Sequence, residues 1–308
     1  MSFLSKSLQE YLTLRRSLGY KLVREGMWLP GLVRFVEKAG SSHITQALAV
    51  SWAMGRKNPP SPSWSRRLRM ARKFTQYLHA LDPRTEIPLL ELAPPERRSR
   101  FEPYIYRDED VIALMGAARK ICTPFKGETY STMIGLLAST GLRVGEVIRL
   151  DRADFDARQG LLQIRHTKFG KSRLVPLHTS TTQALQEYAG KRDRAIPRPA
   201  IPAFFPSTQG TRLIHVNFHV RFLKMVRLIG LDHAKPQRPR IHDLRHTFAI
   251  QTLTSWYRAG LDTGPRLPAL STYLGHVSPS STYTYLRATP ELLQQARRRL
   301  EKTKGGRS

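Results

Sequence analysis

The sequence predicts a mainly α protein with a small antiparallel β element, arranged in two domains. Apolar residues recur at intervals of three and four over much of the 308 residues, which is the period of a helix buried on one side. Two short runs of β type, LLQIRH at residues 161–166 and RLVPL at 173–177, flank a polar segment with a glycine and predict a hairpin. Residues 93–104, APPERRSRFEPY, are rich in proline and charge without periodicity, and predict a linker between the domains.

The N-terminal domain, residues 1–92, is expected to hold four helices. The first is expected to end at Gly19 and the second at Gly40, because glycine commonly follows the last turn of a helix. A third is expected over residues 44–54, with Ser41 and Ser42 as capping residues, and a fourth from near Ser65. The apolar positions with helical spacing are Leu4, Leu8, Tyr11, Leu12, Leu18, Leu32, Phe35, Val36, Leu68, Ala71, Phe74, Leu78 and Leu81.

The fourth helix carries basic residues mostly off its apolar stripe. They are Arg66, Arg67, Arg69, Arg72 and Lys73. One face of such a helix can pack while the other meets phosphate, although a basic run is more commonly a solvated face. The charge of the whole chain favours DNA contact here.

The C-terminal domain, residues 105–308, is expected to hold further helices around the hairpin. Asp108 is suited to cap a helix that runs through Ala118, and an apolar helix over residues 131–138 meets a turn at Thr140 and Gly141. Helices are expected again at 179–188 and 216–229, with a proline-rich loop between them. Thr289 and Pro290 are expected to open a final helix.

The charge of the chain points to a polyanionic partner. Lys and Arg number 51 against 23 Asp and Glu, which gives a net charge of +28. Residues 1–100 carry +11 and residues 101–308 carry +17, so both domains are expected to touch a phosphate backbone, as in a two-part clamp. A charged surface that only confers solubility is the alternative, and the dominance of Arg, which suits bidentate phosphate contact, weighs against it.

Composition also excludes several classes of protein. The single cysteine, Cys122, rules out an intrachain disulfide or a Cys-based zinc cluster and suits a reducing compartment. The sequence has no run of 18 apolar residues, which argues against a membrane span, and its N-terminus lacks the apolar stretch of a signal peptide, which argues against secretion. We therefore expect a folded, cytoplasmic, nucleoid-associated protein.

Four separated segments carry residues suited to phosphodiester chemistry. They are residues 139–147 with Arg143, the hairpin with Lys168, residues 242–246 with His242 and Arg245, and residues 274–276 followed by Tyr283 and Tyr285. Two arginines offer fixed forks for the oxygens of a transferring phosphate, so that no metal or other cofactor is required. His242 and Arg245 are three residues apart and share a helix face. A lysine at a hairpin tip can protonate a leaving oxygen, and a tyrosine activated by cations can attack phosphorus.

In this order, with Tyr285 nine residues after His276, the four segments resemble the tyrosine recombinase (phage integrase) family over residues 106–290. The resemblance implies a helical, SAM-like N-terminal core-binding domain and a tyrosine-recombinase catalytic domain with a C-terminal helix that docks on a neighbouring protomer. It selects Tyr285 as the nucleophile, leaves Tyr283 as a packing residue and gives Glu146 a supporting role. The catalytic set it implies is Arg143, Lys168, His242, Arg245, His276 and Tyr285. The implied product is a 3′-phosphotyrosyl DNA and a free 5′ hydroxyl.

Each of these residues also has an ordinary interpretation. Arg143 could pair only with Glu146, and Lys168 could be an exposed turn lysine with Lys171 and Arg173, both candidate DNA contacts, close enough to compete for its role. His242 and His246 have the spacing of a helical metal pair, but the motif lacks the glutamate and cysteine that such sites use. The GKS of residues 170–172 ends like a phosphate-binding loop, but the first glycine of that motif is replaced by Arg165.

Taken together, these features predict a site-specific recombinase that cuts and rejoins double-stranded DNA in integration, excision or transposition. Its expected partners are specific recombination sites and further copies of itself, as a tetramer on DNA, with or without other recombinases. The ATPELL sequence at 288–293 is similar to recombinases of transposons and other mobile genetic elements. The alternatives are a basic accessory protein that binds DNA without cutting it, and a type IB topoisomerase-like enzyme that relaxes DNA.

Overall fold

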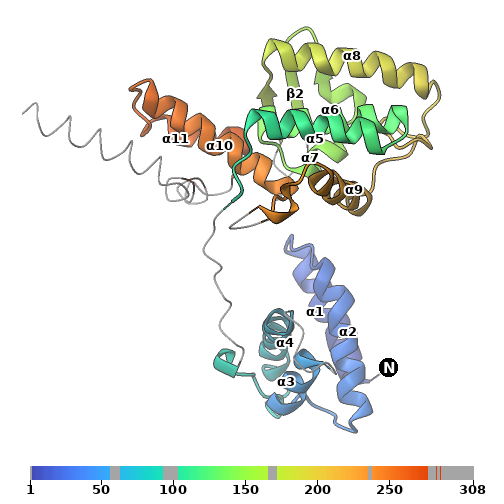
Figure 1. Cartoon of the computed structure of the whole chain (residues 1–308). Coiled ribbons are helices and arrows are strands. Elements are labelled where there is room, and N and C mark those ends of the chain that lie inside the picture. Colours follow the sequence, from blue (N-terminus) through green and yellow to red (C-terminus); the bar gives the residue numbers. More distant parts are fainter. Residues whose placement is uncertain are drawn as a thin grey trace, which may run out of the picture. The chain divides into compact units, whose positions relative to one another are not determined.

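The structure is a computed structural model that describes residues 2–55, 63–92, 103–165, 172–234 and 238–276, together with Thr282 and Tyr285. The chain divides into two compact units, residues 1–99 and 100–308 (Figure 1). Most of the predicted linker, residues 93–102, lies outside the described residues, as do the hairpin tip with Lys168 and the expected C-terminal helix. The mainly helical fold class with a small antiparallel sheet is confirmed.

The N-terminal unit is a helical bundle, as predicted. Its helices are α1 (Phe3–Ser17), α2 (Val23–Lys38), α3 (Gln46–Met54) and α4 (Trp64–His79), followed by the short η1 (Leu90–Leu92). Their apolar stripes meet in one core, in which side chains such as Leu32 and Phe74 are fully buried. Burial of this kind stabilises short helices that would be marginal in isolation.

Several details of the N-terminal prediction were wrong. Leu18 and Phe35, expected among the apolar positions of the first two helices, are 63% and 37% exposed. Thr45 caps α3 in place of the expected serines, because its side-chain oxygen accepts a hydrogen bond from the Leu48 N–H at 3.3 Å. Leu81 does not belong to the apolar stripe of α4, since that helix ends at His79 and Leu81 is 52% exposed.

The C-terminal unit packs helices around the central α6 (Figure 1). Its helices are α5 (Asp108–Ile121), α6 (Pro124–Thr140), α7 (Val144–Arg149), α8 (Thr179–Ala195), α9 (His215–Leu228), α10 (Ile241–Arg258) and α11 (Arg266–Leu274), with the short η2 (Arg152–Asp154) and η3 (Leu231–His233). The strands β1 (Phe155–Asp156), β2 (Leu161–Ile164) and β3 (Arg173–Pro176) form an antiparallel sheet in that order. The pairing of Leu162 with Val175 places two fully buried side chains on the core face of the predicted hairpin.

Two predicted features of the C-terminal unit also differ. Asp108 begins α5 but does not cap it; Arg107 is the N-cap, and its backbone N–H donates to Asp110 at 3.0 Å. The apolar helix expected over residues 131–138 is longer, since α6 begins at Pro124. The segment of residues 254–272 is largely helical, because α10 continues to Arg258 and α11 begins at Arg266. Pro268 is tolerated there since the first turn of a helix leaves its N–H groups without intrahelical partners.

None of the described helices is both long and apolar enough to span a membrane.

Candidate active site

The end of α6 brings the first predicted arginine into position. Gly141 adopts a left-handed conformation with φ of 61° and turns the chain from α6 toward Arg143, the N-cap of α7. A Cβ at residue 141 would lie 2.6 Å from Cδ1 of Phe248 on α10. Glycine is therefore required here both by the backbone conformation and by the closeness of α10.

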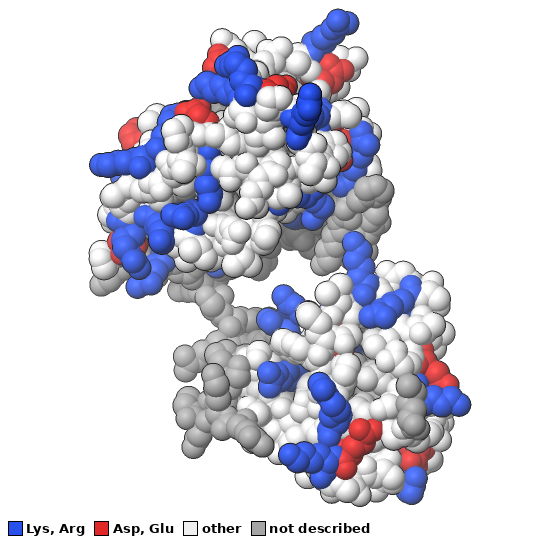
Figure 2. Space-filling model, turned by 90° about the vertical axis from the view of Figure 1, so that its right-hand side faces the viewer, with Lys and Arg blue, Asp and Glu red and all other residues white. Residues whose placement is uncertain are grey.

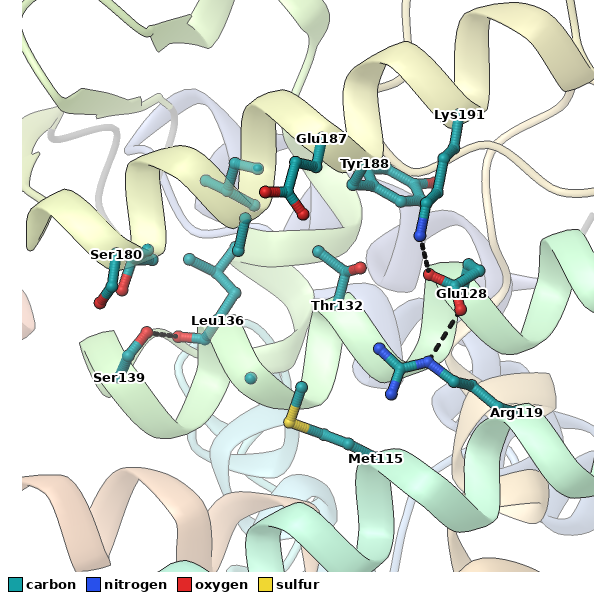
Figure 3. Close-up of a pocket in the computed structure, with 14 residues that line it drawn as sticks. Met115, Arg119, Glu128, Thr132, Leu136, Ser139, Ser180, Glu187, Tyr188 and Lys191 are labelled. Carbon is teal, nitrogen blue, oxygen red and sulfur yellow. Dashed lines mark hydrogen bonds and ion pairs between the residues drawn. The ribbon is translucent and has the colours of Figure 1, made fainter.

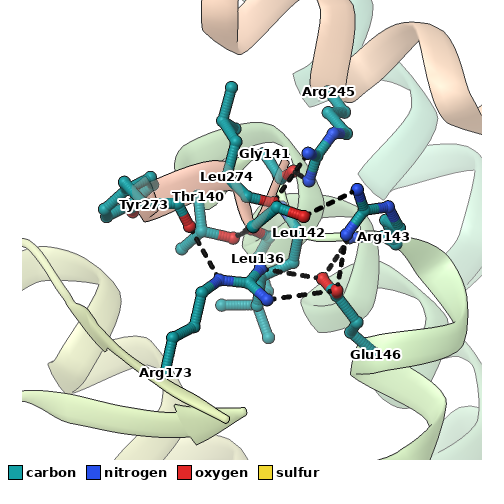
Figure 4. A network of polar contacts seen from close by, with 11 residues as sticks. Leu136, Thr140, Gly141, Leu142, Arg143, Glu146, Arg173, Arg245, Tyr273 and Leu274 are labelled. Carbon is teal, nitrogen blue, oxygen red and sulfur yellow. Dashed lines mark hydrogen bonds and ion pairs between the residues drawn. The ribbon is translucent and has the colours of Figure 1, made fainter. Parts of the chain in front are cut away.

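Glu146 is the buried centre of a polar network around Arg143 (Figure 4). Its Oε1 accepts from Nη1 of Arg143 at 2.9 Å, and its Oε2 accepts from the backbone N–H of Arg143 at 3.0 Å. The remaining bond from the Arg143 guanidinium runs from Nη2 to the carbonyl oxygen of Gly275 at 3.1 Å. The Arg143 side chain is 34% exposed, so its guanidinium faces both the network and solvent.

Arg173, at the start of β3, completes this network from the opposite side. Its Nη1 and Nη2 donate to the two oxygens of Glu146 at 3.2 and 3.0 Å, and its Nε donates to the carbonyl oxygen of Tyr273 at 2.8 Å. Burial by itself would raise the pKa of Glu146, but the hydrogen bonds and charge of Arg173, with Arg143, outweigh it and lower that pKa. Glu146 is therefore a carboxylate at neutral pH.

Arg245 on α10 is the second predicted arginine, and it is 2% exposed. Its Nη1 donates to the carbonyl oxygen of Gly141 at 2.9 Å, and its Nη2 donates to that of Leu274 at 2.7 Å (Figure 4). Burial, followed by the charge of Arg143, lowers the pKa of Arg245 to about 10. The guanidinium stays charged at neutral pH and holds the ends of α6 and α11 together.

Tyr285 lies against Arg245 and two histidine rings. Its hydroxyl is hydrogen-bonded to the Arg245 side chain, and its ring centroid is 5.5 Å from that of His246 and 6.0 Å from that of His276. The side chain is 3% exposed. Burial raises the pKa of Tyr285, and Arg245 and Arg143 oppose the rise, so the phenol is protonated in the free protein.

The three histidines of the site are neutral at pH 7. Burial, followed by the charge of Arg245, lowers the pKa of His276 to about 4. The pKa of His242 is lowered as well, because protein atoms surround much of its ring and Arg245 is close, although the residue is exposed at the surface. Burial and His242 lower the pKa of His246 to about 3. Nδ1 of His276 is hydrogen-bonded to Oγ1 of Thr282 at 2.8 Å, which leaves its Nε2 for another partner.

The described part of the chain contains no cluster of three or more His, Cys, Asp or Glu side chains that could hold a metal ion. His242 and His246 do lie edge to face, with ring centroids 4.6 Å apart. However, Asp243 turns to Arg240, whose Nη2 lies 2.9 Å from its Oδ1. The metal-pair interpretation of the two histidines therefore has no third ligand among the described residues.

The fold thus brings five of the six predicted catalytic residues together with the supporting Glu146. They come from the α6–α7 junction, from α10 and from the end of α11 and beyond, and they are Arg143, His242, Arg245, His276 and Tyr285. Lys168, Lys171 and Tyr283 lie outside the described residues.

The basic residues expected to bind DNA fall into two groups. Arg66 and Lys73 are exposed on α4, and Arg69 is half-buried. Arg67 instead lies over the rings of Trp28 and Trp52, at 5.4 and 5.9 Å from their centroids, and Arg72 donates to the carbonyl oxygen of Pro88. Figure 2 shows Lys and Arg side chains spread over the visible face of both units, with acidic ones among them.

Sequence reasoning missed the place of Arg173 in the site. The expectation was an exposed DNA contact, whereas its side chain is 10% exposed and its guanidinium is bonded to Glu146 and Tyr273. This geometry favours an internal role over the DNA contact. Strand alternation could have indicated it, since Arg173 shares the inward face of β3 with the buried Val175 while Leu174 points outward.

A separate cavity of about 210 Å³ lies between α5, α6 and α8. Figure 3 shows Glu128 bridging Arg119 and Lys191 at its wall, with N–O distances of 2.8 and 2.9 Å. None of the predicted catalytic residues lines this cavity. The three charged side chains tie the three helices together, so the cavity gives no support to a second reaction centre.

Comparisons with known proteins agree with the geometry. The sequence pattern of the phage integrase family matches residues 106–291. The chain is 41% identical to "Putative integrase/recombinase y4rB" of Sinorhizobium fredii, covering 98% of both chains, and 30% identical to tyrosine recombinase XerC of Pelotomaculum thermopropionicum, covering 76% of this chain and 73% of that one.

Solved structures share the fold at lower identity. The Tn1549 transposon integrase in complex with transposon right end DNA has a TM-score of 0.66 and 20% identity, covering 96% of this chain and 99% of that one. A lambda integrase tetramer bound to a Holliday junction has a TM-score of 0.63 and 17% identity, covering 92% and 76%.

Proposed function

This chain belongs to the phage integrase family and is a site-specific tyrosine recombinase that acts on DNA, and from this premise we propose that Tyr285 is its nucleophile. Arg143 and Arg245 hold the scissile phosphate, His242 and His276 add contacts to it, and Lys168 protonates the leaving 5′ oxygen. The observation that carries the proposal is the position of the Tyr285 hydroxyl on Arg245, beside two neutral histidines.

The charges of the site suit the transition state of phosphoryl transfer. Attack by Tyr285 on phosphorus gives a pentacoordinate centre with extra negative charge on its non-bridging oxygens. The guanidinium groups of Arg143 and Arg245 are fixed by carbonyl oxygens before DNA arrives, so little reorganisation is needed when that charge develops. The phosphate would approach past His242, which is exposed, and past Arg143, whose side chain is 34% exposed.

Proton movement follows from the neutral histidines. Because Tyr285 begins as a protonated phenol, its proton must leave as the P–O bond forms, and a neutral imidazole can accept it. With Nδ1 of His276 engaged by Thr282, its Nε2 can donate to a phosphate oxygen. The products are a 3′-phosphotyrosyl bond and a free 5′ hydroxyl. The phosphotyrosyl bond retains the energy of the broken phosphodiester. The 5′ hydroxyl of another strand can therefore attack the phosphotyrosyl bond, release Tyr285 and join the two strands.

The finer assignments are also proposals. Residues 1–92 would form the core-binding domain, contacting DNA through Arg66 and Lys73, and residues 105–308 the catalytic domain. Assembly as a tetramer on paired recombination sites is supported by the lambda integrase tetramer, whose fold this chain shares. A role in transposition of a mobile element is supported by the Tn1549 transposon integrase in the same way.

A covalent-trapping experiment tests the nucleophile. The protein is incubated with a nicked suicide duplex that carries its recombination site, denatured and run on a gel. The wild type and Tyr283→Phe should form a protein–DNA adduct, and Tyr285→Phe should form none. An adduct with Tyr285→Phe would show that another residue attacks.

The suicide duplex, together with a supercoiled plasmid and a pair of recombination sites, separates the alternative functions. A DNA-binding accessory protein would shift the duplex without any covalent adduct. A topoisomerase-like enzyme would relax a supercoiled plasmid without exchanging strands between two sites, whereas a recombinase should exchange them.

A further inference from the structure

We infer that Arg173 is a positioning residue of the recombination site, which fixes Glu146 and Arg143 and seats the turn at Gly275 that carries His276. The inference deepens the proposed function and depends on it. Arg173 is not expected to contact the scissile phosphate, because its guanidinium is hydrogen-bonded to Glu146 and to the carbonyl oxygen of Tyr273.

Arg173 limits how Glu146 can bind Arg143. Oε1 of Glu146 accepts from Nη1 of Arg173 and from Nη1 of Arg143. Oε2 accepts from Nη2 of Arg173 and from the backbone N–H of Arg143. The Arg143 side chain therefore makes a single bond to the carboxylate and one, through Nη2, to the carbonyl oxygen of Gly275, and its remaining N–H groups are left for the phosphate. Without Arg173, the free lone pairs of Glu146 would favour a two-bond fork with Arg143 and draw it away from the phosphate.

Arg173 also sets the charge of the site. Glu146 is 3% exposed and has two arginines as partners, so the network keeps a positive charge in excess next to Arg245. Loss of Arg173 would leave Glu146 and Arg143 as a neutral pair. The negative charge that develops on the phosphate during attack would then meet one cation fewer, next to a buried carboxylate where each charge counts for more than in bulk solvent.

Gly275 is shaped to accept this side chain. It ends α11 with φ of 68°, and a Cβ at this position would lie 2.6 Å from Nη1 and 2.8 Å from Cζ of Arg173. The Gly275 carbonyl oxygen accepts from Arg143, and the next residue is His276. Arg173 thus touches the turn that positions a third member of the catalytic set, and the strand it begins follows the segment that carries Lys168.

The test separates binding from chemistry. Duplex affinity and the single-turnover rate of adduct formation at saturating suicide substrate are measured for Arg173→Met, Arg173→Lys and Glu146→Gln. Arg173→Met should lower the rate about 10- to 100-fold, as is typical when an orienting partner is lost, with affinity unchanged. Arg173→Lys should recover only part of the rate, because an ammonium cannot span both carboxylate oxygens.

Coupling distinguishes positioning from an independent effect. If Arg173 acts through Glu146, the double variant Arg173→Met/Glu146→Gln should be no slower than the slower single variant. Multiplied losses in the double variant would overturn the inference. So would an affinity loss with an unchanged rate, which would make Arg173 a DNA contact, or no change in either quantity.

One further variant is a control for the loss of a buried arginine, and another replaces Arg173→Met if that variant does not fold. Arg192→Met removes a 4% exposed arginine of α8 that bonds to the Phe204 carbonyl and Asp193, remote from the site network, and should leave the rate unchanged. If Arg173→Met does not fold, Gly275→Ala should reproduce the rate loss by displacing the guanidinium, and a normal rate in that variant would overturn the inference. Absence of any adduct with the wild type would instead refute the proposed function.

Discussion

At the scale of single residues, the site depends on groups whose protonation is set by burial among cations. His246 is 6% exposed and lies among His242, Arg240 and Arg245, which together with burial hold its pKa at about 3. His276 has its pKa held at about 4 in the same way. Both are neutral in the folded chain at pH values at which they would be protonated when unfolded.

This shift predicts a pH dependence of stability. Below about pH 6.5 the unfolded chain takes up protons at these histidines and the folded chain does not, so the free energy of unfolding should fall as the pH drops from 6.5 toward 4. Urea unfolding at several pH values measures it, and His246→Gln should flatten the slope. His233→Gln, at a side chain that is 87% exposed, should leave the slope as it is; equal slopes in all three proteins would contradict the prediction.

At the scale of elements, the site is made where helices end. α6 ends in Gly141 and α11 in Gly275, both left-handed, and the carbonyl oxygens of Gly141 and Leu274 accept from the same Arg245 guanidinium. The last carbonyls of a helix have no intrahelical donor, so an arginine from α10 satisfies them while it is itself held in place. The contacts that end these two helices thus also hold Arg245, one of the two arginines that we propose to bind the phosphate.

Gly141→Ala should therefore destabilise the protein more than an ordinary glycine substitution at positive φ. The backbone alone should cost about 1 kcal/mol, and the contact of the new Cβ with Phe248 should add about 1–3 kcal/mol. Gly230→Ala is the matched control, since Gly230 has φ of 73° and no neighbouring atom within 4 Å of its Cβ position. Equal losses of unfolding free energy for the two variants would show that the approach of α10 is not constrained there.

At the scale of the whole molecule, both units carry positive charge that is not paired off. The net charge of +28 is spread over residues 1–100 and 101–308, and exposed side chains such as Arg66 and Lys73 project from α4. Binding of such a chain to DNA releases condensed counterions, which makes affinity depend steeply on salt.

Duplex affinity should fall at least about 10³-fold between 50 and 200 mM salt, the loss expected for six or more phosphate contacts. Arg66→Ala and Lys73→Ala should each reduce the slope of log affinity against log salt by about 1. Arg84→Ala should leave it unchanged, because Arg84 is paired with Asp82 at 2.9 Å. A flat salt dependence for the wild type would argue against a clamp that holds the phosphate backbone.

The amino-acid sequence by itself determined the helical class and the hairpin, and it supplied the set of reactive residues that we propose. Periodicity reports which face of an element is buried, and ordered motifs report chemistry, so α1, α6 and β2–β3 could be predicted together with Arg143, Arg245 and Tyr285. Local rules failed at caps, as at Thr45 and Arg107, where several residues compete for the same position.

Only the tertiary structure decided what those residues touch. Arg173 and Glu146 are 27 positions apart, and Arg245 and Gly141 are 104 apart, so no local pattern could pair them. An arginine next to a hairpin has the same sequence signature whether it binds DNA or a buried carboxylate. The difference is made by the cost of burying Glu146 without partners, which the fold removes by turning Arg173 inward.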